Sequence, residues 1–259
     1  MKPFIFVILI ATAASADENP ILRELKRYGH DAKDLATQPL RWDQHQWTRF
    51  AEGTTAVAAF YAADRHLYDE AQRHRSASTN DFAKAITPFG GRRALDISAL
   101  LILGGALSRN TNLRDAGRDS LESEIWAGGV VTPLLKRMFG RSRPSEGVGA
   151  RRFRPFSSGH ESFPSGHATN AFAFATGIAS HYDNWIVPTI VYSIATGVAF
   201  SRVNDRAHFP SDVVAGALIG RAVAKGVFAR HSGKNTTWQI VPMYQRRGSS
   251  IFGFSARAR

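Results

Sequence analysis

The chain has 259 residues and no cysteine, so no disulfide can stabilise it, and its stability must come from a packed apolar core. Long apolar runs are also scarce. The single uncharged run near membrane-spanning length lies between Asp183 and Arg202, and Asn184 and Pro188 interrupt it. A multi-spanning membrane protein needs several spans of about 20 residues each. The sequence therefore favours a soluble protein, and with no internal repeat its length suits one main domain.

Acidic residues are outnumbered, because 33 Lys and Arg face 21 Asp and Glu and leave a net charge of +12. Such an excess suits nucleic acid, an anionic membrane surface or a phosphorylated substrate. Between residues 136 and 154 Glu146 is the one acidic residue among these basic ones: Lys136, Arg137, Arg141, Arg143, Arg151, Arg152 and Arg154. A field of that sign attracts anions. Taken singly, Arg137, Arg141 and Arg151 are interpreted as solvated surface residues.

The ends of the chain differ in composition from its middle. Residues 1–16 carry Lys2, an apolar run and the small residues Ala14, Ser15 and Ala16, a pattern typical of a cleaved signal peptide. An uncleaved anchor is the alternative, although the apolar run is too short to span a bilayer. Export argues against a nucleic-acid partner. We expect a helical domain over residues 17–235 and a C-terminal tail or β-hairpin over residues 236–259.

Apolar periodicity predicts a helical protein. We expect an apolar helix face formed by Trp47, Phe50, Ala51, Thr54, Ala58 and Tyr61 to lie in the core, and a polar surface section to follow from Asp64 to Thr79. A glycine pair, Gly104 and Gly105, indicates close approach of a neighbour to a buried helix, and Pro133 indicates a kink or late break. The expected helices are Gln44–Ala63, Leu95–Leu107, Leu113–Lys136, Ala168–His181, Trp185–Arg202 and Pro210–Ala229, with an irregular loop over residues 140–162.

The chemistry concentrates in residues 201–212, Ser-Arg-Val-Asn-Asp-Arg-Ala-His-Phe-Pro-Ser-Asp. Pro210 suits the first position of a helix, which leaves His208 on the turn before it and Asp212 in the first turn. At this spacing the carboxylate can accept a proton from one imidazole nitrogen and leave the other free to attack. Arg202 supplies a planar fork of donors suited to phosphate. Alone, the pattern also fits a helix cap beside a surface ion pair.

Two upstream segments add to it. In Ser162-Phe163-Pro164-Ser165-Gly166-His167, a Pro-Ser-Gly turn opens an apolar helix. Main-chain amides of Ser165, Gly166 and His167, together with the Ser165 hydroxyl, can hold phosphate oxygens there. His167 can also donate a proton. Further upstream Lys136 and Arg143 place two cations around a glycine-containing turn.

In this order, K-x6-R-P, P-S-G-H and S-R-x5-H-x3-D resemble the signature of the type-2 phosphatidic acid phosphatase superfamily, which includes bacterial non-specific acid phosphatases and vanadium haloperoxidases. The motifs cover residues 136–212, and a looser likeness runs from about Asp64 to Arg221. The resemblance implies an all-α, single-domain helical bundle with the active site at helix ends. It also implies a metal-independent phosphatase that hydrolyses phosphomonoesters or lipid (di)phosphates through a phosphohistidine.

The resemblance assigns the roles. His208 would be the nucleophile, Asp212 would orient it and His167 would protonate the leaving group. The residues expected to hold the phosphate are Lys136, Arg143, Ser165, Gly166 and Arg202. No cofactor or metal is expected. The expected partners are a phosphorylated substrate and a membrane surface, at a periplasmic location.

Three alternatives stay open. A zinc hydrolase using His167, His208 and Asp212 would lose activity to chelators, although the surrounding cations would repel a metal. A vanadate-dependent haloperoxidase is disfavoured because the known ones are typically much larger than this chain. A non-catalytic, basic, membrane-surface binding module is disfavoured by the intact catalytic set. The sequence leaves open the oligomeric state and the choice among phosphatidic acid, a polyprenyl diphosphate, lipid A phosphates and small phosphomonoesters.

Overall fold

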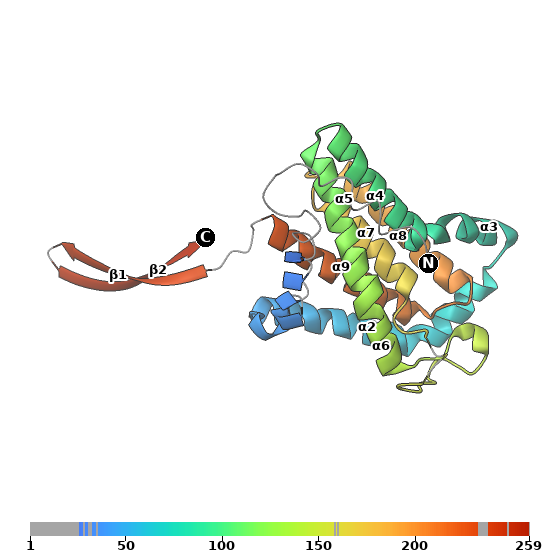
Figure 1. Ribbon diagram of the computed structural model, residues 1–259. Helices are drawn as coiled ribbons and strands as arrows, with labels where there is room; N and C mark the ends of the chain where they lie inside the picture. Colours follow the sequence, from blue (N-terminus) through green and yellow to red (C-terminus); the bar gives the residue numbers. More distant parts are fainter. Residues whose placement is uncertain are drawn as a thin grey trace. The chain divides into compact units, whose positions relative to one another are not determined.

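The computed structural model describes residues 26–27, 29–30, 33–34, 36–157, 159, 161–232, 238–247 and 249–258 (Figure 1). The predicted signal peptide, residues 1–16, lies outside the described residues. Two compact units are formed, one that ends at Val227 and one that begins at Phe228.

The first unit is helical, as expected. Its regular elements are η1 (Gln38–Arg41), α2 (Gln44–Arg73), α3 (Ala77–Ile86), η2 (Thr87–Gly90), α4 (Arg92–Leu107), α5 (Thr111–Glu124), η3 (Ile125–Val131), α6 (Thr132–Phe139), η4 (Pro144–Glu146), α7 (Gly166–Ala179), α8 (Ile186–Asn204) and α9 (Pro210–His231) up to Val227.

Helix α2 begins where the sequence predicts, because Asp43 and Gln46 cap it reciprocally. It continues ten residues beyond the expected end at Ala63. Asp64 is the one buried residue of α2, so this polar helix extends along the surface. The core prediction for Trp47 and Phe50 is wrong: they are 50% and 54% exposed and pack with Trp42 in an aromatic cluster instead.

Helix α7 is central, since it packs against both α5 and α8 (Figure 1). Small side chains make this close packing possible, and the core cluster consists of Ala171, Ala175, Ala195 and Val198. A Cβ on Gly220 of α9 would lie 2.2 Å from the carbonyl oxygen of Thr169 in α7. The helix that begins at the Pro-Ser-Gly turn is therefore fixed from three sides.

The predicted buried helix around the glycine pair is α4, but its burial was overestimated. Leu100 and Leu107 are 65% and 78% exposed, whereas the buried residues of α4 are Ala94, Ser98 and Gly105. The physical reason is that α4 contacts α5 over only a narrow part of its surface. Helix α4 meets α5 along a narrow strip that includes Gly105 and Gly117, so Leu100, Leu103 and Leu107 stay exposed.

The long helix predicted over residues 113–136 divides into α5, a π-helical segment η3 and α6. Pro133 lies in the first turn of α6, where its missing N–H costs least. Lys136 lies in the last turn of α6, as expected, and Gly140 ends that helix in the left-handed region with φ of 57°. A side chain could not replace glycine there, because its Cβ would lie 1.8 Å from the carbonyl oxygen of Arg154.

The second unit contains an antiparallel hairpin of β1 (Trp238–Arg247) and β2 (Ser249–Ala258). Trp238 pairs with Ala258 and Arg247 with Ser249. These strands lie within residues 236–259, for which the sequence predicts a C-terminal tail or a β-hairpin.

The glycine pair of α4 provides a matched test of this packing. A Cβ at Gly105 would lie 2.4 Å from the main-chain nitrogen of Arg114, whereas nothing lies within 4 Å of one at Gly104. We expect Gly105→Ala to lower the free energy of unfolding by about 2 kcal/mol through overpacking. Gly104→Ala should raise it by about 0.5 to 1 kcal/mol, because alanine favours a helix. Chemical denaturation of both variants measures the difference, and equal effects would contradict this packing of α4 on α5.

Candidate active site

His208 lies on the turn between α8 and α9 and is almost completely buried. Its Nδ1 is 2.7 Å from the carbonyl oxygen of Ser162, and 3.8 Å from Oδ2 of Asp212. A carbonyl oxygen can only accept a hydrogen bond, so Nδ1 carries the proton and Nε2 has the free electron pair. The direct Asp212 bond that the spacing predicted is therefore replaced by a bond to a main-chain carbonyl.

Asp212 is occupied by other donors. Its Oδ2 accepts from the hydroxyl of Ser162 at 2.5 Å and the amide of Phe209 at 2.9 Å, and its Oδ1 accepts from Arg141 at 2.6 Å. Burial alone would raise the pKa of Asp212, but His208, Arg141 and Ser162 hold it below its ordinary value. The carboxylate is ionised and close enough to stabilise a positive charge on His208.

The pKa of His208 is lowered by burial, and the cations Lys136 and Arg143 add to the effect, whereas Asp212 acts against it. A lowered pKa keeps the imidazole neutral near pH 7. Nucleophilic attack requires this form.

Ser165 is the N-cap of α7. Its hydroxyl accepts from the amide of Ala168 at 3.5 Å, and its own amide donates to the carbonyl oxygen of Asp212 at 2.9 Å. The amide of Ser165 is therefore occupied, whereas its hydroxyl only accepts here and keeps its own O–H to donate to an anion. The amides at the start of α7 that remain for an anion are those of Gly166 and His167.

His167 lies in the first turn of α7, near the cationic residues. Burial lowers its pKa to about 4, and the lowering is reinforced by Arg202, His208, Lys136 and Arg143. Charged and titratable groups of the first motif, Lys136 and Arg143, and of the third, Arg202 and His208, thus act on the imidazole of the second.

The cations repel one another in this partly buried region. Burial and Arg143 lower the pKa of Lys136 to about 8. The Lys136 ammonium donates to the carbonyl oxygen of Glu161, and the Arg202 guanidinium donates to Asp205. In the described part of the chain, the Nε of Arg202 is buried without a hydrogen-bond partner. A bound anion would satisfy that donor and relieve the repulsion.

The zinc alternative requires a group of metal ligands around His167, His208 and Asp212. Among the described residues, no group of three or more His, Asp or Glu side chains could hold a metal ion. The oxygens of Asp212, which the zinc alternative needs as ligands, accept hydrogen bonds from Arg141, Ser162 and Phe209.

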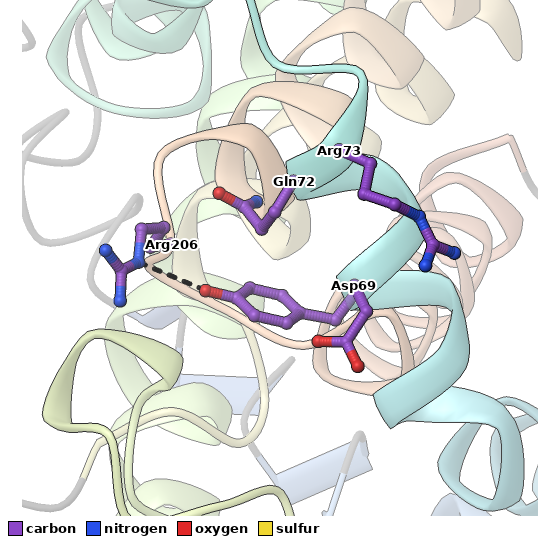
Figure 2. A pocket seen from close by; sticks show the side chains of 5 residues that line it. Asp69, Gln72, Arg73 and Arg206 are labelled. Carbon is purple, nitrogen blue, oxygen red and sulfur yellow. Dashed lines mark hydrogen bonds between the residues drawn. The ribbon is translucent and has the colours of Figure 1, made fainter.

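A cleft of about 460 Å³ lies beside the turn between α8 and α9. Its lining residues are Tyr68, Asp69, Gln72, Arg73 and Arg206 (Figure 2). Arg206 donates to the hydroxyl of Tyr68 at 3.2 Å, and the Gln72 amide donates to the carbonyl oxygen of Val203 at 2.9 Å. The end of α8 and the turn that follows it are thereby bound to α2.

Sequence reasoning missed two residues of this region. Arg141, interpreted as a solvated surface cation, is fully buried and bound to Asp212, and Asp64 of α2 binds the same guanidinium. The one signal available was the position of Arg141 directly after the helix-ending Gly140. Nothing in the sequence marked Asp64 as its partner.

Comparison with known proteins places this site in context. Residues 123–235 match the PAP2 superfamily. The lipid A 1-phosphatase of Rhizobium etli is 34% identical over 162 residues, which cover 56% of this chain and 68% of that protein. The lipid A 1-phosphatase of Rhizobium johnstonii is 43% identical over 36% of this chain and 38% of its own. A probable diacylglycerol pyrophosphate phosphatase 1 of Schizosaccharomyces pombe is 30% identical over 50% of this chain and 59% of its own.

Two solved structures share the fold. The transmembrane PAP2-type phosphatidylglycerolphosphate phosphatase from Bacillus subtilis has a TM-score of 0.56 at 24% identity, over 73% of this chain and 96% of its own. LpxE of Aquifex aeolicus has a TM-score of 0.51 at 24% identity, over 63% of this chain and 93% of its own.

Gly166 offers a test of the anion site. A Cβ there would lie 3.7 Å from Thr132 and 3.9 Å from Lys136, which are ordinary contacts, so packing does not require glycine at this position. We expect Gly166→Ala to keep the melting temperature within about 2 °C. It should weaken binding of inorganic phosphate about tenfold, or about 1.4 kcal/mol, because the methyl group lies beside the helix amides.

Competitive inhibition by phosphate measures this affinity. Gly90→Ala is the contrasting variant, since its Cβ would lie 2.5 Å from Val198 and should destabilise the fold. Unchanged phosphate affinity in Gly166→Ala would show that the start of α7 does not bind the anion.

Proposed function

Because the chain belongs to the PAP2 superfamily, we propose that it is a metal-independent phosphatase that removes a phosphate group from a lipid through a phosphohistidine on His208. The observation that carries this proposal is the protonation pattern of His208. Its Nδ1 donates to the carbonyl oxygen of Ser162, so the free electron pair of Nε2 is available in a neutral imidazole surrounded by cations.

In the first step, Nε2 of His208 forms a bond to phosphorus as the bond between phosphorus and the leaving oxygen breaks. His167 donates its proton to that oxygen. The imidazole of His208 then carries a positive charge, which the Asp212 carboxylate stabilises from 3.8 Å while Nδ1 keeps its bond to Ser162. Water next attacks phosphorus, His167 takes a proton from this water, and the bond between Nε2 and phosphorus breaks.

The non-bridging oxygens of the phosphoryl group carry the charge of the transition state. Lys136, Arg143 and Arg202 act as fixed positive charges for them, in the role that Mg²⁺ plays in many phosphoryl-transfer enzymes. The amides of Gly166 and His167 add donors at the positive end of the α7 dipole.

Two observations support a lipid as the substrate. The relatives named above include two lipid A 1-phosphatases and a probable diacylglycerol pyrophosphate phosphatase. Helix α6, which carries Lys136, also exposes Leu134, Met138 and Phe139.

Of the described residues, Ile186–Asn204 form one helix long and apolar enough to cross a membrane. Membrane association of the exported protein belongs to this proposal.

The nucleophile test uses the purified protein, a lipid phosphate in detergent micelles and a soluble aryl phosphate, each with and without EDTA. We expect phosphate release that EDTA does not reduce, and His208→Ala should lower it at least 1,000-fold because the covalent route is lost. Phosphohistidine hydrolyses in acid. The reaction with ³²P-labelled substrate is therefore quenched with alkali, and the labelled protein is then detected.

His74→Ala is the matched control, since this histidine follows the last residue of α2 and is exposed, so the variant should keep full activity. Label retained by His208→Ala, or activity lost to EDTA, would contradict the proposed mechanism. Preference for the aryl phosphate over the lipid would contradict the substrate alone.

The two histidines also predict the pH dependence. His208 must be neutral and His167 protonated, and the pKa of each is lowered in the free enzyme, that of His167 to about 4. A bound phosphate dianion offsets the cations and raises the pKa of His167. We therefore expect kcat/KM to be greatest at acidic pH and the kcat optimum to lie at higher pH.

His167→Gln separates this effect from ionisation of the substrate. It should remove the alkaline limb of kcat and reduce the rate more on an alkyl than on an aryl phosphate, because an aryl leaving group needs less protonation. Equal losses on both substrates would exclude His167 as the proton donor.

A further inference from the structure

Arg141 is the most completely bonded side chain near the proposed site. It is fully buried, and its guanidinium donates five hydrogen bonds, which equals its number of N–H groups. The acceptors are Asp64, Ala150 (twice, through its carbonyl oxygen), Ser211 and Asp212. No N–H group is left to bind a phosphate, so Arg141 has a different role from Arg143.

Aromatic rings enclose the same guanidinium. The centroids of Phe209, Tyr61 and Phe153 lie 4.5, 5.1 and 5.4 Å from its central carbon. Rings at these distances attract a cation and exclude water from it. The position of Arg141 is therefore fixed by both hydrogen bonds and packing.

Asp64 extends this arrangement to α2. Its Oδ2 accepts from Arg141 and from the Ser211 hydroxyl, each at 2.6 Å, and its Oδ1 accepts from the Ser211 amide at 2.8 Å. Asp64 thus holds both Arg141 and the first turn of α9, where Asp212 follows Ser211.

Arg141, Ser162 and Asp212 form a closed ring of hydrogen bonds. The carbonyl oxygen of Arg141 accepts from the amide of Ser162 at 2.9 Å, the hydroxyl of Ser162 donates to Asp212 at 2.5 Å, and Asp212 accepts from Arg141 at 2.6 Å. The carbonyl oxygen of Ser162, which accepts from Nδ1 of His208, belongs to this ring. Arg141 therefore holds both groups that face Nδ1.

We propose that Arg141, held in place by Asp64, is a positioning residue that fixes the Ser162 carbonyl and the Asp212 carboxylate so that Nε2 of His208 points at phosphorus. The proposal rests on the proposed function of His208 as the nucleophile. Stability explains the arrangement poorly. Burying a guanidinium with two carboxylates carries a large desolvation cost, and apolar residues of similar volume are often equally stable. Such an ionic group is better explained by the geometry that it enforces.

The opposing explanation is that Arg141 only clamps the loop over residues 140–162, since two of its bonds go to the carbonyl oxygen of Ala150. The pH profile of kcat/KM distinguishes a positioning role of Arg141 from a role in clamping the loop. A smaller folded fraction lowers the whole profile without moving its limbs, whereas a change of charge near His208 moves the acid limb. The charged or titratable groups that act on His208 are Lys136, Arg143, His167 and Asp212, with Arg141 and Asp64 behind Asp212 and Arg202 beside His167.

Three variants are compared with the wild type on the soluble aryl phosphate. Arg141→Lys keeps the charge but supplies three donors on a flexible stem. We expect kcat to fall about 10- to 100-fold, since small misplacements of a reacting group have effects of that size. KM should stay within about twofold, because phosphate contacts are untouched, and the acid limb should not move.

The other two variants change the charge in opposite directions. In Arg141→Gln the charge of Asp212 is no longer offset, so His208 holds its proton more tightly and the acid limb moves to higher pH by about one unit. Asp64→Asn removes a negative charge and should move the limb to lower pH, with a loss of kcat. Arg137→Lys, in the same basic segment but exposed, should leave kcat, KM and both limbs unchanged.

Opposite movements of the acid limb with a reduced kcat would support positioning. Limbs that stay fixed while all profiles fall would overturn it in favour of a clamp, as would Arg141→Lys within threefold of the wild-type kcat. If Arg141→Gln does not fold, Arg141→Lys and Asp64→Asn decide the question. Failure of the proposed function is recognised separately, because the wild type would then release no phosphate or His208→Ala would remain active.

Discussion

The hydrogen bond from Nδ1 of His208 to the carbonyl oxygen of Ser162 is the interaction on which the chemistry of this molecule depends. A neutral acceptor fixes the tautomer without the strong increase in basicity that a directly bonded carboxylate would cause. The imidazole therefore stays neutral and nucleophilic although it lies beside an ionised Asp212. At 3.8 Å the carboxylate can still stabilise the positive charge that the proposed attack would place on His208.

The fold must also hold like charges together. Lys136 at the end of α6, Arg143 on the following loop and Arg202 at the end of α8 all act on His167, and the first two also act on His208. Their repulsion is withstood because each comes from a separately anchored element. Gly140 closes α6, and small residues bring α7 close to α5, α8 and α9. The free energy of packing thus maintains a site that is electrostatically strained until an anion enters.

Sequence patterns predicted the elements that have strong local signals. Helices α7 and α9 begin within two residues of prediction because Ser165 caps one and Pro210 opens the other. Three kinds of fact could not be predicted. Trp47 and Phe50 lie on an apolar face that is exposed, and periodicity does not reveal what covers a face. The amide of Ser165 is taken by Asp212, a contact that only the fold creates.

The third kind of fact that the sequence could not predict is the burial of Arg141. Its charge placed it among solvated basic residues, and its partner Asp64 lies 77 residues away without any motif. A buried arginine and an exposed one have the same sequence letter. The pair could be recognised only once α2 and the start of α9 were placed on either side of the guanidinium. The residues proposed to contact the phosphate thus produced readable motifs, whereas the residues proposed to align them did not.

The lipid proposal rests on the difference between the two faces of α6. Leu134 and Met138 are one helical turn apart and are 59% and 45% exposed, whereas Lys136, midway between them in sequence, lies about 200° around the helix from either. One face of α6 thus carries the cation into the site and the opposite face presents apolar side chains. A phosphate bound at Lys136 lies within a helix diameter of an apolar surface, about 10 Å. The catalytic groups themselves recognise only the phosphoryl end, so this surface is where selection of a lipid would have to occur.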